Sequence, residues 1–210
     1  MKKELQKRML FMASGLQVRE DSLDNNNRTI EGCAIVFNKE TVLYEGRYYR
    51  EREIISPSCI TEEFLQSQDI KLNLLHERSD SLARNNKGEG TLTLDLREDG
   101  LYFSVPLPEC DLGDRALALI RNKTYTGCSF EFWPEESNES TTIDKDGRED
   151  TLIVHTKFNK ISALTIAMDP AYIDTTINEA REHCSKKESD IEKRMSEEEE
   201  AEDNRIADER

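Results

Sequence analysis

Residues 126–133 place a hydroxyl inside an aromatic, strand-like run. Phe130 and Phe132 alternate with Ser129 and Glu131. On a pleated strand the two rings therefore face one side, while the hydroxyl and the carboxylate face the other. A serine held on a rigid strand is a candidate nucleophile if a base lies beside it. Most strand serines are structural, so the pattern alone favours that simpler role.

Cys128 is a second candidate nucleophile beside the serine. Its side chain points to the opposite face of the strand, toward the aromatic rings, where a small buried thiol is the more common role. The sequence has no HExxH or EF-hand spacing, no P-loop and no GxGxxG. We therefore expect neither a metal nor a cofactor.

The chain has three histidines, His76, His155 and His183. His183 lies in a charged tail and is not a candidate. His76 precedes Ser129 and His155 follows it, each on an expected strand. A serine needs a base to become nucleophilic, and that base needs a partner that fixes its tautomer. The two histidines are candidates for these two roles, although most single histidines at strand ends are structural.

Composition excludes several classes of protein. The 210 residues carry a formal net charge of -15, which argues against binding nucleic acid through its phosphates. The sequence has no apolar run long enough for a membrane helix, and we expect no signal peptide at its start. Its five cysteines are scattered without a CxxC pair, which is typical of reduced thiols in a cytosolic compartment.

The chain divides into an N-terminal extension over residues 1–14, a body over 15–180 and a charged tail over 181–210. The tail is acidic with few apolar residues, which predicts a solvated helix or a disordered segment outside any core. Alternation predicts a mostly β body with two or three short helices, one capped by Thr61. The expected strands cover 16–20, 28–38, 42–44, 48–55, 70–76, 90–96, 101–105, 126–133, 152–158 and 161–168, with a polar loop after His76 and helices near 61–65 and 114–122.

Several segments, in this order, resemble the prohead (capsid maturation) proteases of tailed bacteriophages, which share a fold with herpesvirus assemblin. The strand 30–38 is similar to the family's "EGYAAVFN", and 127–132 to "G.SFGF". The other matching segments are 54–60 ("E.I.PGAF"), 74–77 (the "NHD" histidine strand), 82–84 ("LGR"), 98–103 ("D..GL.F") and 169–172 ("PAY"). The resemblance spans about residues 16–178.

The resemblance implies an α+β fold that is mainly β, with an assemblin-like closed β-barrel flanked by short helices. It implies a serine endopeptidase with Ser129 as nucleophile and His76 as general base. Many family members carry a glutamate in an "EVS" strand, where this chain has Ala163, Leu164 and Thr165. Assemblin uses a second histidine at a spacing similar to that of His155, so His155 is predicted as the third catalytic residue. Asp169 and Glu131 are the alternatives.

The resemblance also implies partners and a place of action. The substrates would be the scaffold, or the scaffold-like segment of the major capsid protein, and the protease itself. It would act inside the viral procapsid in the host cytoplasm, with self-association and without nucleic acid or membrane. Because the "EVS" carboxylate is absent, a non-catalytic capsid-assembly factor that keeps the protease fold is the alternative.

Overall fold

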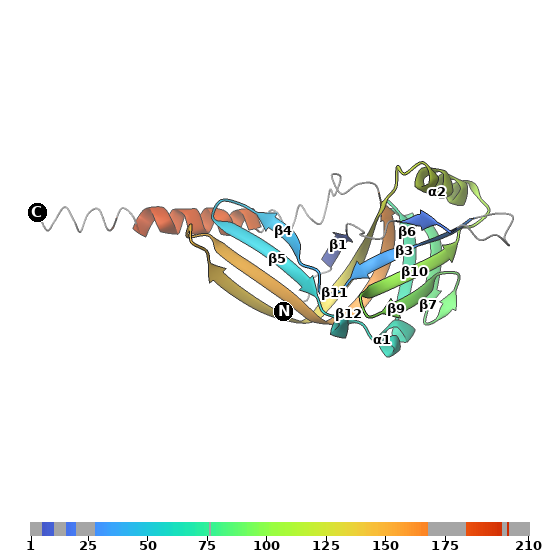
Figure 1. The fold of residues 1–210 in the computed structure, drawn as a ribbon, viewed down its shortest axis with the longest axis horizontal. Coiled ribbons are helices and arrows are strands. Elements are labelled where there is room, and N and C mark those ends of the chain that lie inside the picture. The colour runs from blue at the N-terminus through green and yellow to red at the C-terminus, as the bar shows by residue number, and fades with distance from the viewer. Residues whose placement is uncertain are drawn as a thin grey trace, which may run out of the picture.

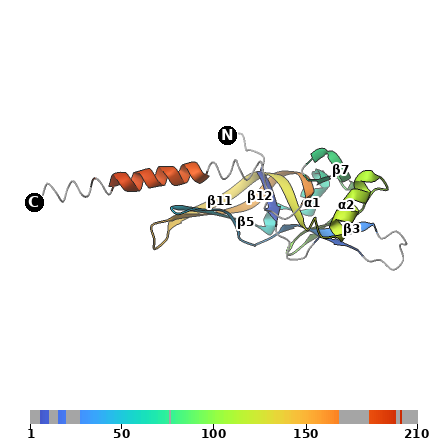
Figure 2. The ribbon, with the colours of Figure 1, turned by 90° about the horizontal axis from the view of Figure 1, so that it is seen from above.

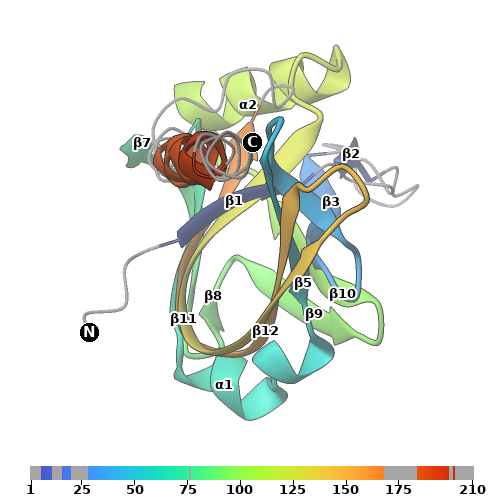
Figure 3. The same ribbon diagram turned by 90° about the vertical axis from the view of Figure 1, so that its left-hand side faces the viewer.

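Two long antiparallel strands, β11 (Gly127–Ile143) and β12 (Glu149–Ala167), run through the molecule and link its two parts. The computed structural model describes residues 6–10, 16–19, 28–75, 77–167, 184–198 and 201. Figure 1 shows a body at one end of the hairpin and an extended arm at the other. The pairing shifts at four places between Glu131 and Ser137, around Pro134, and the strands curve there (Figure 3). Bulges bend strands, and proline cannot donate to the ladder.

β12 changes its second neighbour halfway along its length. Its first half pairs in parallel with β5 (Tyr49–Ile55), which pairs with β4 (Thr41–Glu45), and these strands form the arm. Its second half pairs in parallel with β6 (Asp69–Leu74) in the body. The body side of this eight-stranded sheet runs β1–β11–β12–β6–β7–β8. The remaining strands are β1 (Gln6–Leu10), β7 (Glu77–Asn86) and β8 (Glu89–Gly90).

A second sheet of four strands faces the first one in the body. Its order is β2 (Gln17–Val18), β3 (Thr29–Val36), β10 (Gly100–Pro106) and β9 (Thr93–Arg97). One hydrophobic core joins Ile35 and Phe103 of this sheet with Phe130 of β11. The expectation of a mainly β fold with few helices is confirmed. The closed barrel is not found, because within the described ranges no ladder links the two sheets and apolar packing joins them instead.

Short helices close the ends of the body. After the turn η1 (Pro57–Cys59), helix α1 (Glu62–Ser67) starts at Thr61, whose hydroxyl accepts a hydrogen bond from the Phe64 amide at 3.1 Å. The predicted cap is thus confirmed, and such a cap contributes about 1 kcal/mol. Helix α2 (Asp111–Arg121) lies beyond β10 and buries one apolar face, formed by Ala116, Leu117 and Ile120.

The predicted polar loop after His76, and an acidic segment for which no strand was predicted, are both strands in the structure. The polar segment after His76 forms β7, which pairs along its length with β6. The acidic segment 135–143 continues β11 as one strand of the arm hairpin, and Gly147, at φ +78°, makes the turn. Neither segment shows the apolar alternation of a half-buried strand. In the second segment the reason is that the arm part of β11 is mostly exposed.

Residues 184–198 are helical and pack on the arm, whereas the sequence placed them outside any core. Cys184 and Ile191 are buried against Tyr49 of β5. Glu188 accepts hydrogen bonds from the Tyr44 hydroxyl and, at 3.0 Å, from the Tyr48 amide. Figure 2 shows this helix on one side of the thin arm.

Candidate active site

Ser129 lies on β11 in the body, where the pairing is regular from Gly127 to Glu131. Its backbone neighbours are Met9 on β1 and Thr165 on β12. Only 1% of Ser129 is exposed. The alternation expected from the sequence is present, since Phe130 belongs to the main core and Ser129 faces the other way.

A row of polar side chains crosses the sheet at Ser129. Ser129 pairs with Thr165, Thr165 with Asn73 on β6, and Asn73 with Ser81 on β7. Residues paired in this way point to the same face of a sheet. The Ser81 hydroxyl donates to the Asn73 side-chain oxygen at 2.7 Å. The Thr165 hydroxyl is fully buried and has no hydrogen-bond partner within the described part of the chain.

A buried carboxylate lies next to this row. Glu131 is on the same face of β11 as Ser129, two residues further along, and only 3% of it is exposed. Its partner across the ladder is Ala163, which offers only a methyl group. The Ser162 hydroxyl donates to Glu131 Oε2 at 3.1 Å. Ser162 is the extra residue of a bulge, since Glu131 pairs with Ala163 and Phe132 with Ile161.

Strand β6 leads into the second predicted residue, His76, which lies outside the described residues. β6 ends beside the serine strand: Leu74 pairs with Ile166, and Ile166 pairs with Cys128. Leu75 then donates its amide to the Ile166 carbonyl at 3.0 Å and adopts φ +53°. A bulky residue in this left-handed region is uncommon, and such strained positions cluster at functional sites.

Cys128 is buried in the main core, on the face opposite Ser129. Burial raises the pKa of its thiol to about 12 and outweighs a hydrogen bond with the Thr165 backbone, which lowers that pKa. The thiolate is the nucleophilic form of cysteine, so this side chain is unreactive near neutral pH. The structure therefore supports the structural role for Cys128.

His155, the predicted third residue, lies in a different environment. It pairs with Ser137, which is eight residues beyond Ser129 on β11 and lies past the four shifts in pairing. Its Nδ1 is 2.8 Å from the Ser137 hydroxyl and its Nε2 is 3.2 Å from Glu53 Oε2. The ring also packs edge-on against Phe132, with centroids 5.3 Å apart. The structure thus does not bring His155 to Ser129, because other partners hold both ring nitrogens.

The remaining candidates add nothing to this site. Asp169 and His183 lie outside the described residues. In the ranges that the structure describes, no group of three His, Cys, Asp or Glu side chains is arranged for a metal ion, and no helix is long and apolar enough to cross a membrane. Sequence reasoning missed Thr165 and Asn73 as neighbours of Ser129. No local signal marks them, because pairing between distant strands creates the row.

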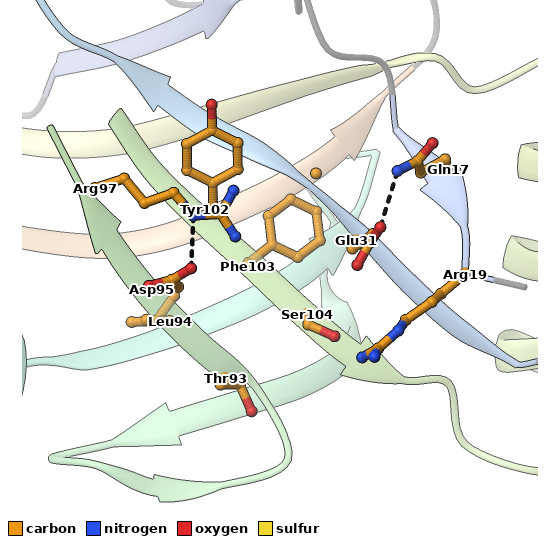
Figure 4. A pocket seen from close by; sticks show the side chains of 11 residues that line it. Gln17, Arg19, Glu31, Thr93, Leu94, Asp95, Arg97, Tyr102, Phe103 and Ser104 are labelled. Carbon is orange, nitrogen blue, oxygen red and sulfur yellow. Dashed lines mark hydrogen bonds and ion pairs between the residues drawn. The ribbon is translucent and has the colours of Figure 1, made fainter. Parts of the chain in front are cut away.

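A groove of about 650 Å³ lies elsewhere, on the four-stranded sheet, and Ser129 does not line it (Figure 4). Several of its charged groups are paired within the groove. Arg97 binds Asp95 at 2.6 Å and covers the Tyr102 ring at 4.0 Å, and Gln17 donates to Glu31 at 2.8 Å. We therefore keep the polar row of the large sheet as the candidate active site.

Comparison with known proteins agrees with the sequence resemblance. A family model described as caudovirus prohead serine protease matches residues 14–190. Among solved structures, the chain is similar to the bacteriophage T4 capsid assembly protease, gp21, with 14% identity and a TM-score of 0.44. That match covers 80% of this chain and 98% of the other. No curated protein matches the chain.

Proposed function

Because the chain belongs to the caudovirus prohead serine protease family, we propose that it is an endopeptidase of procapsid maturation in which Ser129 is the nucleophile and His76 the general base. His76 would take the proton from the Ser129 hydroxyl as its oxygen attacks the scissile carbonyl. The resulting acyl-enzyme is hydrolysed after the same imidazole has protonated the leaving amine.

One observation carries this proposal: Ser129 and Asn73 lie in the same row, separated only by Thr165 on β12. Asn73 is three residues before His76, on the strand that leads to it. Because β12 lies between them, the backbones of Ser129 and Asn73 are two strand spacings apart, which is about 9.5 Å. This geometry supports a base delivered by β6 to a serine held by β11.

The proposed substrates follow from the family. They are the scaffold or the scaffold-like segment of the major capsid protein, and the protease itself, cleaved inside the procapsid in the host cytoplasm. The net charge of -15 is compatible with a partner that presents basic surface. Self-association within the procapsid belongs to the same proposal.

Co-expression with the cognate capsid and scaffold proteins tests the proposal. Mass spectrometry of all chains should find new termini with the unchanged protein and none with Ser129→Ala or His76→Ala. Ser137→Ala is a matched control, because Ser137 lies on the same strand beside His155 and should leave processing unchanged. Undiminished processing by Ser129→Ala contradicts the proposal.

The second candidate is a non-catalytic assembly factor, which the methyl side chain of Ala163 favours. By the sequence resemblance, this position corresponds to the glutamate of the family's "EVS" strand, so the carboxylate that the resemblance would place on β12 is absent from Ala163. In that case the unchanged protein and the three variants would all bind capsid protein, and none of them would produce new termini.

A further inference from the structure

We propose that the Thr165 side chain is a catalytic residue beside Ser129, an inference that rests on the proposed function. Its hydroxyl would donate a hydrogen bond to the negatively charged oxygen that forms when Ser129 attacks a peptide carbonyl. Donors aimed at such an oxyanion lower the barrier to this step. Thr165 would supply one donor from β12, the strand next to that of the nucleophile.

The state of its hydroxyl singles out Thr165. The residue is fully buried on β12, and its Oγ1 atom has no hydrogen-bond partner within the described part of the chain. Thr151, also fully buried on β12, bonds to Thr141 at 2.9 Å. A buried hydroxyl without a partner costs folding free energy, which a valine of the same shape would avoid. Such groups are rare in native proteins, and a catalytic role is one reason for keeping them.

Only one other buried side-chain atom of the described residues shares this property, the Nε atom of Arg50. It belongs to a guanidinium group of the arm whose charge is balanced by Glu45 and Asp150, each 3.8 Å away. An ionic network thus accounts for Arg50. The Thr165 hydroxyl is the case that still needs an explanation.

The position of Thr165 puts this hydroxyl next to the nucleophile. Ser129 and Thr165 are directly paired across the β11–β12 ladder, so their side chains point to the same face with Cβ atoms about 5 Å apart. On its other side Thr165 pairs with Asn73, whose side-chain oxygen already accepts from Ser81 at 2.7 Å. A carbonyl group whose carbon bonds to Ser129 can therefore place its oxygen within hydrogen-bonding reach of Thr165.

Small residues flank Thr165 on the same face. The neighbours two residues before and after it on β12 are Ala163 and Ala167, and Ala167 pairs with Gly127 on β11. A glycine in a strand often marks a place where another backbone approaches closely. The sheet thus offers few side-chain atoms here that would obstruct the main chain of a peptide.

The proposed contact strengthens during the reaction. As the Ser129 oxygen bonds to the carbonyl carbon, the π electron pair of the carbonyl moves to its oxygen, and the serine proton passes to the general base. The Thr165 O–H then donates to an oxyanion, which is a stronger acceptor than a neutral carbonyl. When the bond to the leaving nitrogen breaks, the carbonyl forms again and the contact weakens. Because no described residue holds the hydroxyl, no hydrogen bond within this part of the chain must break first.

The test uses the full chain and a fluorophosphonate probe. The Ser129 oxygen bonds to phosphorus, fluoride leaves, the serine proton passes to the base, and negative charge develops on the phosphoryl oxygen. Thr165→Val keeps the shape of the side chain but removes the donor. We expect it to lower the maximal rate of labelling at least about 100-fold, with the half-saturating probe concentration within about threefold. Processing of the co-expressed capsid protein should fall in parallel.

Urea unfolding separates catalysis from packing. Thr165→Val should unfold at a higher urea concentration than the unchanged protein although it is labelled far more slowly, because a methyl group replaces the buried hydroxyl. Thr165→Ser keeps the donor but loses a buried methyl group, so it should be less stable and yet be labelled within about tenfold of the unchanged rate. A purely structural threonine would change both properties in the same direction.

Two further variants serve as controls. Thr151→Val removes an equally buried hydroxyl from the arm part of β12 and should leave the labelling rate unchanged. Thr165→Ala differs from Thr165→Ser only by the hydroxyl, so the serine variant should be labelled at least about tenfold faster. This last comparison decides the question even if Thr165→Val disturbs the fold.

The outcomes distinguish the two levels of the argument. If Ser129→Ala abolishes labelling and processing while Thr165→Val stays within about threefold of the unchanged protein, this inference is wrong and the proposed function stands. A Thr165→Ser variant no faster than Thr165→Ala, or a Thr151→Val variant as slow as Thr165→Val, also overturns the inference. If the unchanged protein neither reacts nor processes, or if Ser129→Ala does both normally, the proposed function itself is wrong.

Discussion

Two adjacent residues, Cys128 and Ser129, illustrate how one strand separates two chemistries. The thiol faces the aromatic core, where burial keeps it protonated. The hydroxyl faces the polar row that includes Thr165 and Asn73. Ser129 is therefore the candidate nucleophile because of the face on which it lies, although a thiol such as that of Cys128 is intrinsically the stronger nucleophile. This difference could be predicted from the alternation of residues 126–133.

The first prediction concerns the reactivity of the five thiols. Cys110 is exposed, and the other four, including Cys128, are buried. Iodoacetamide at pH 8 should therefore modify Cys110 first and leave Cys128 unmodified in the folded protein. Peptide mapping measures this order. Cys128→Ala should keep full fluorophosphonate labelling of Ser129, and loss of labelling in a folded Cys128→Ala variant would restore the thiol as a candidate.

The second prediction concerns the hydroxyl of Thr165, which has no hydrogen-bond partner among the residues that the structure describes. A buried hydroxyl without a partner destabilises the fold, so Thr165→Val should raise the free energy of unfolding by about 1 kcal/mol. Thr151→Val is the matched control, because Thr151 is equally buried on the same strand but bonds to Thr141 at 2.9 Å. Thr151→Val should lower the free energy of unfolding by about 1 kcal/mol. Urea unfolding compares the two, and equal losses would contradict this reasoning.

At the scale of elements, the change of neighbours along β12 separates the body from the arm. β6 follows its body half and β5 its arm half. Local patterns predicted the two strands β4 and β5 and the cap at Thr61. They could not predict these parallel pairings, because strands far apart in the chain set the register. The same limit explains why His155 was predicted beside the serine.

The third prediction tests the role of His155 in the arm. Glu53→Ala leaves His155 Nε2 without its partner, which should cost about 2–3 kcal/mol in unfolding free energy. Ser137→Ala, at the exposed end of the same chain of bonds, should cost about 1 kcal/mol. Both variants should keep the rate of Ser129 labelling. A folded Glu53→Ala variant without labelling would place His155 in the catalytic machinery after all.

At the scale of the whole molecule, the arm and the C-terminal helix form a unit with its own small core. Tyr49, Cys184 and Ile191 are its buried members. The sequence of the tail predicted a solvated segment because a few apolar residues in a highly charged stretch give no clear periodic pattern. The contact becomes visible only when the arm provides the opposite apolar surface.

The fourth prediction is that acid loosens this helix from the arm. Burial opposes ionisation of Glu188, but hydrogen bonds from Tyr44 and from the Tyr48 and Arg47 amides outweigh it and lower the pKa of the carboxyl. A lowered pKa in the folded state stabilises the contact at neutral pH, and this contribution is lost as the pH falls below about 4. Below this pH, the backbone amides of residues 184–198 should exchange faster in pulsed hydrogen exchange, after correction for intrinsic rates.

Glu188→Gln removes the charge at every pH and provides the control for this effect. It should exchange faster than the unchanged protein at pH 7, and its exchange should depend less on acid after correction for intrinsic rates. Identical exchange profiles of the two proteins would show that Glu188 does not hold the helix on the arm.

The most direct measurement maps the fluorophosphonate adduct on the protein by peptide mass spectrometry. If Ser129 is the nucleophile and His76 its base, the adduct lies on Ser129, is absent from Ser129→Ala, and forms far more slowly in His76→Ala. An adduct on another residue, or equal labelling of Ser129→Ala, would contradict the assignment of this strand as the active site.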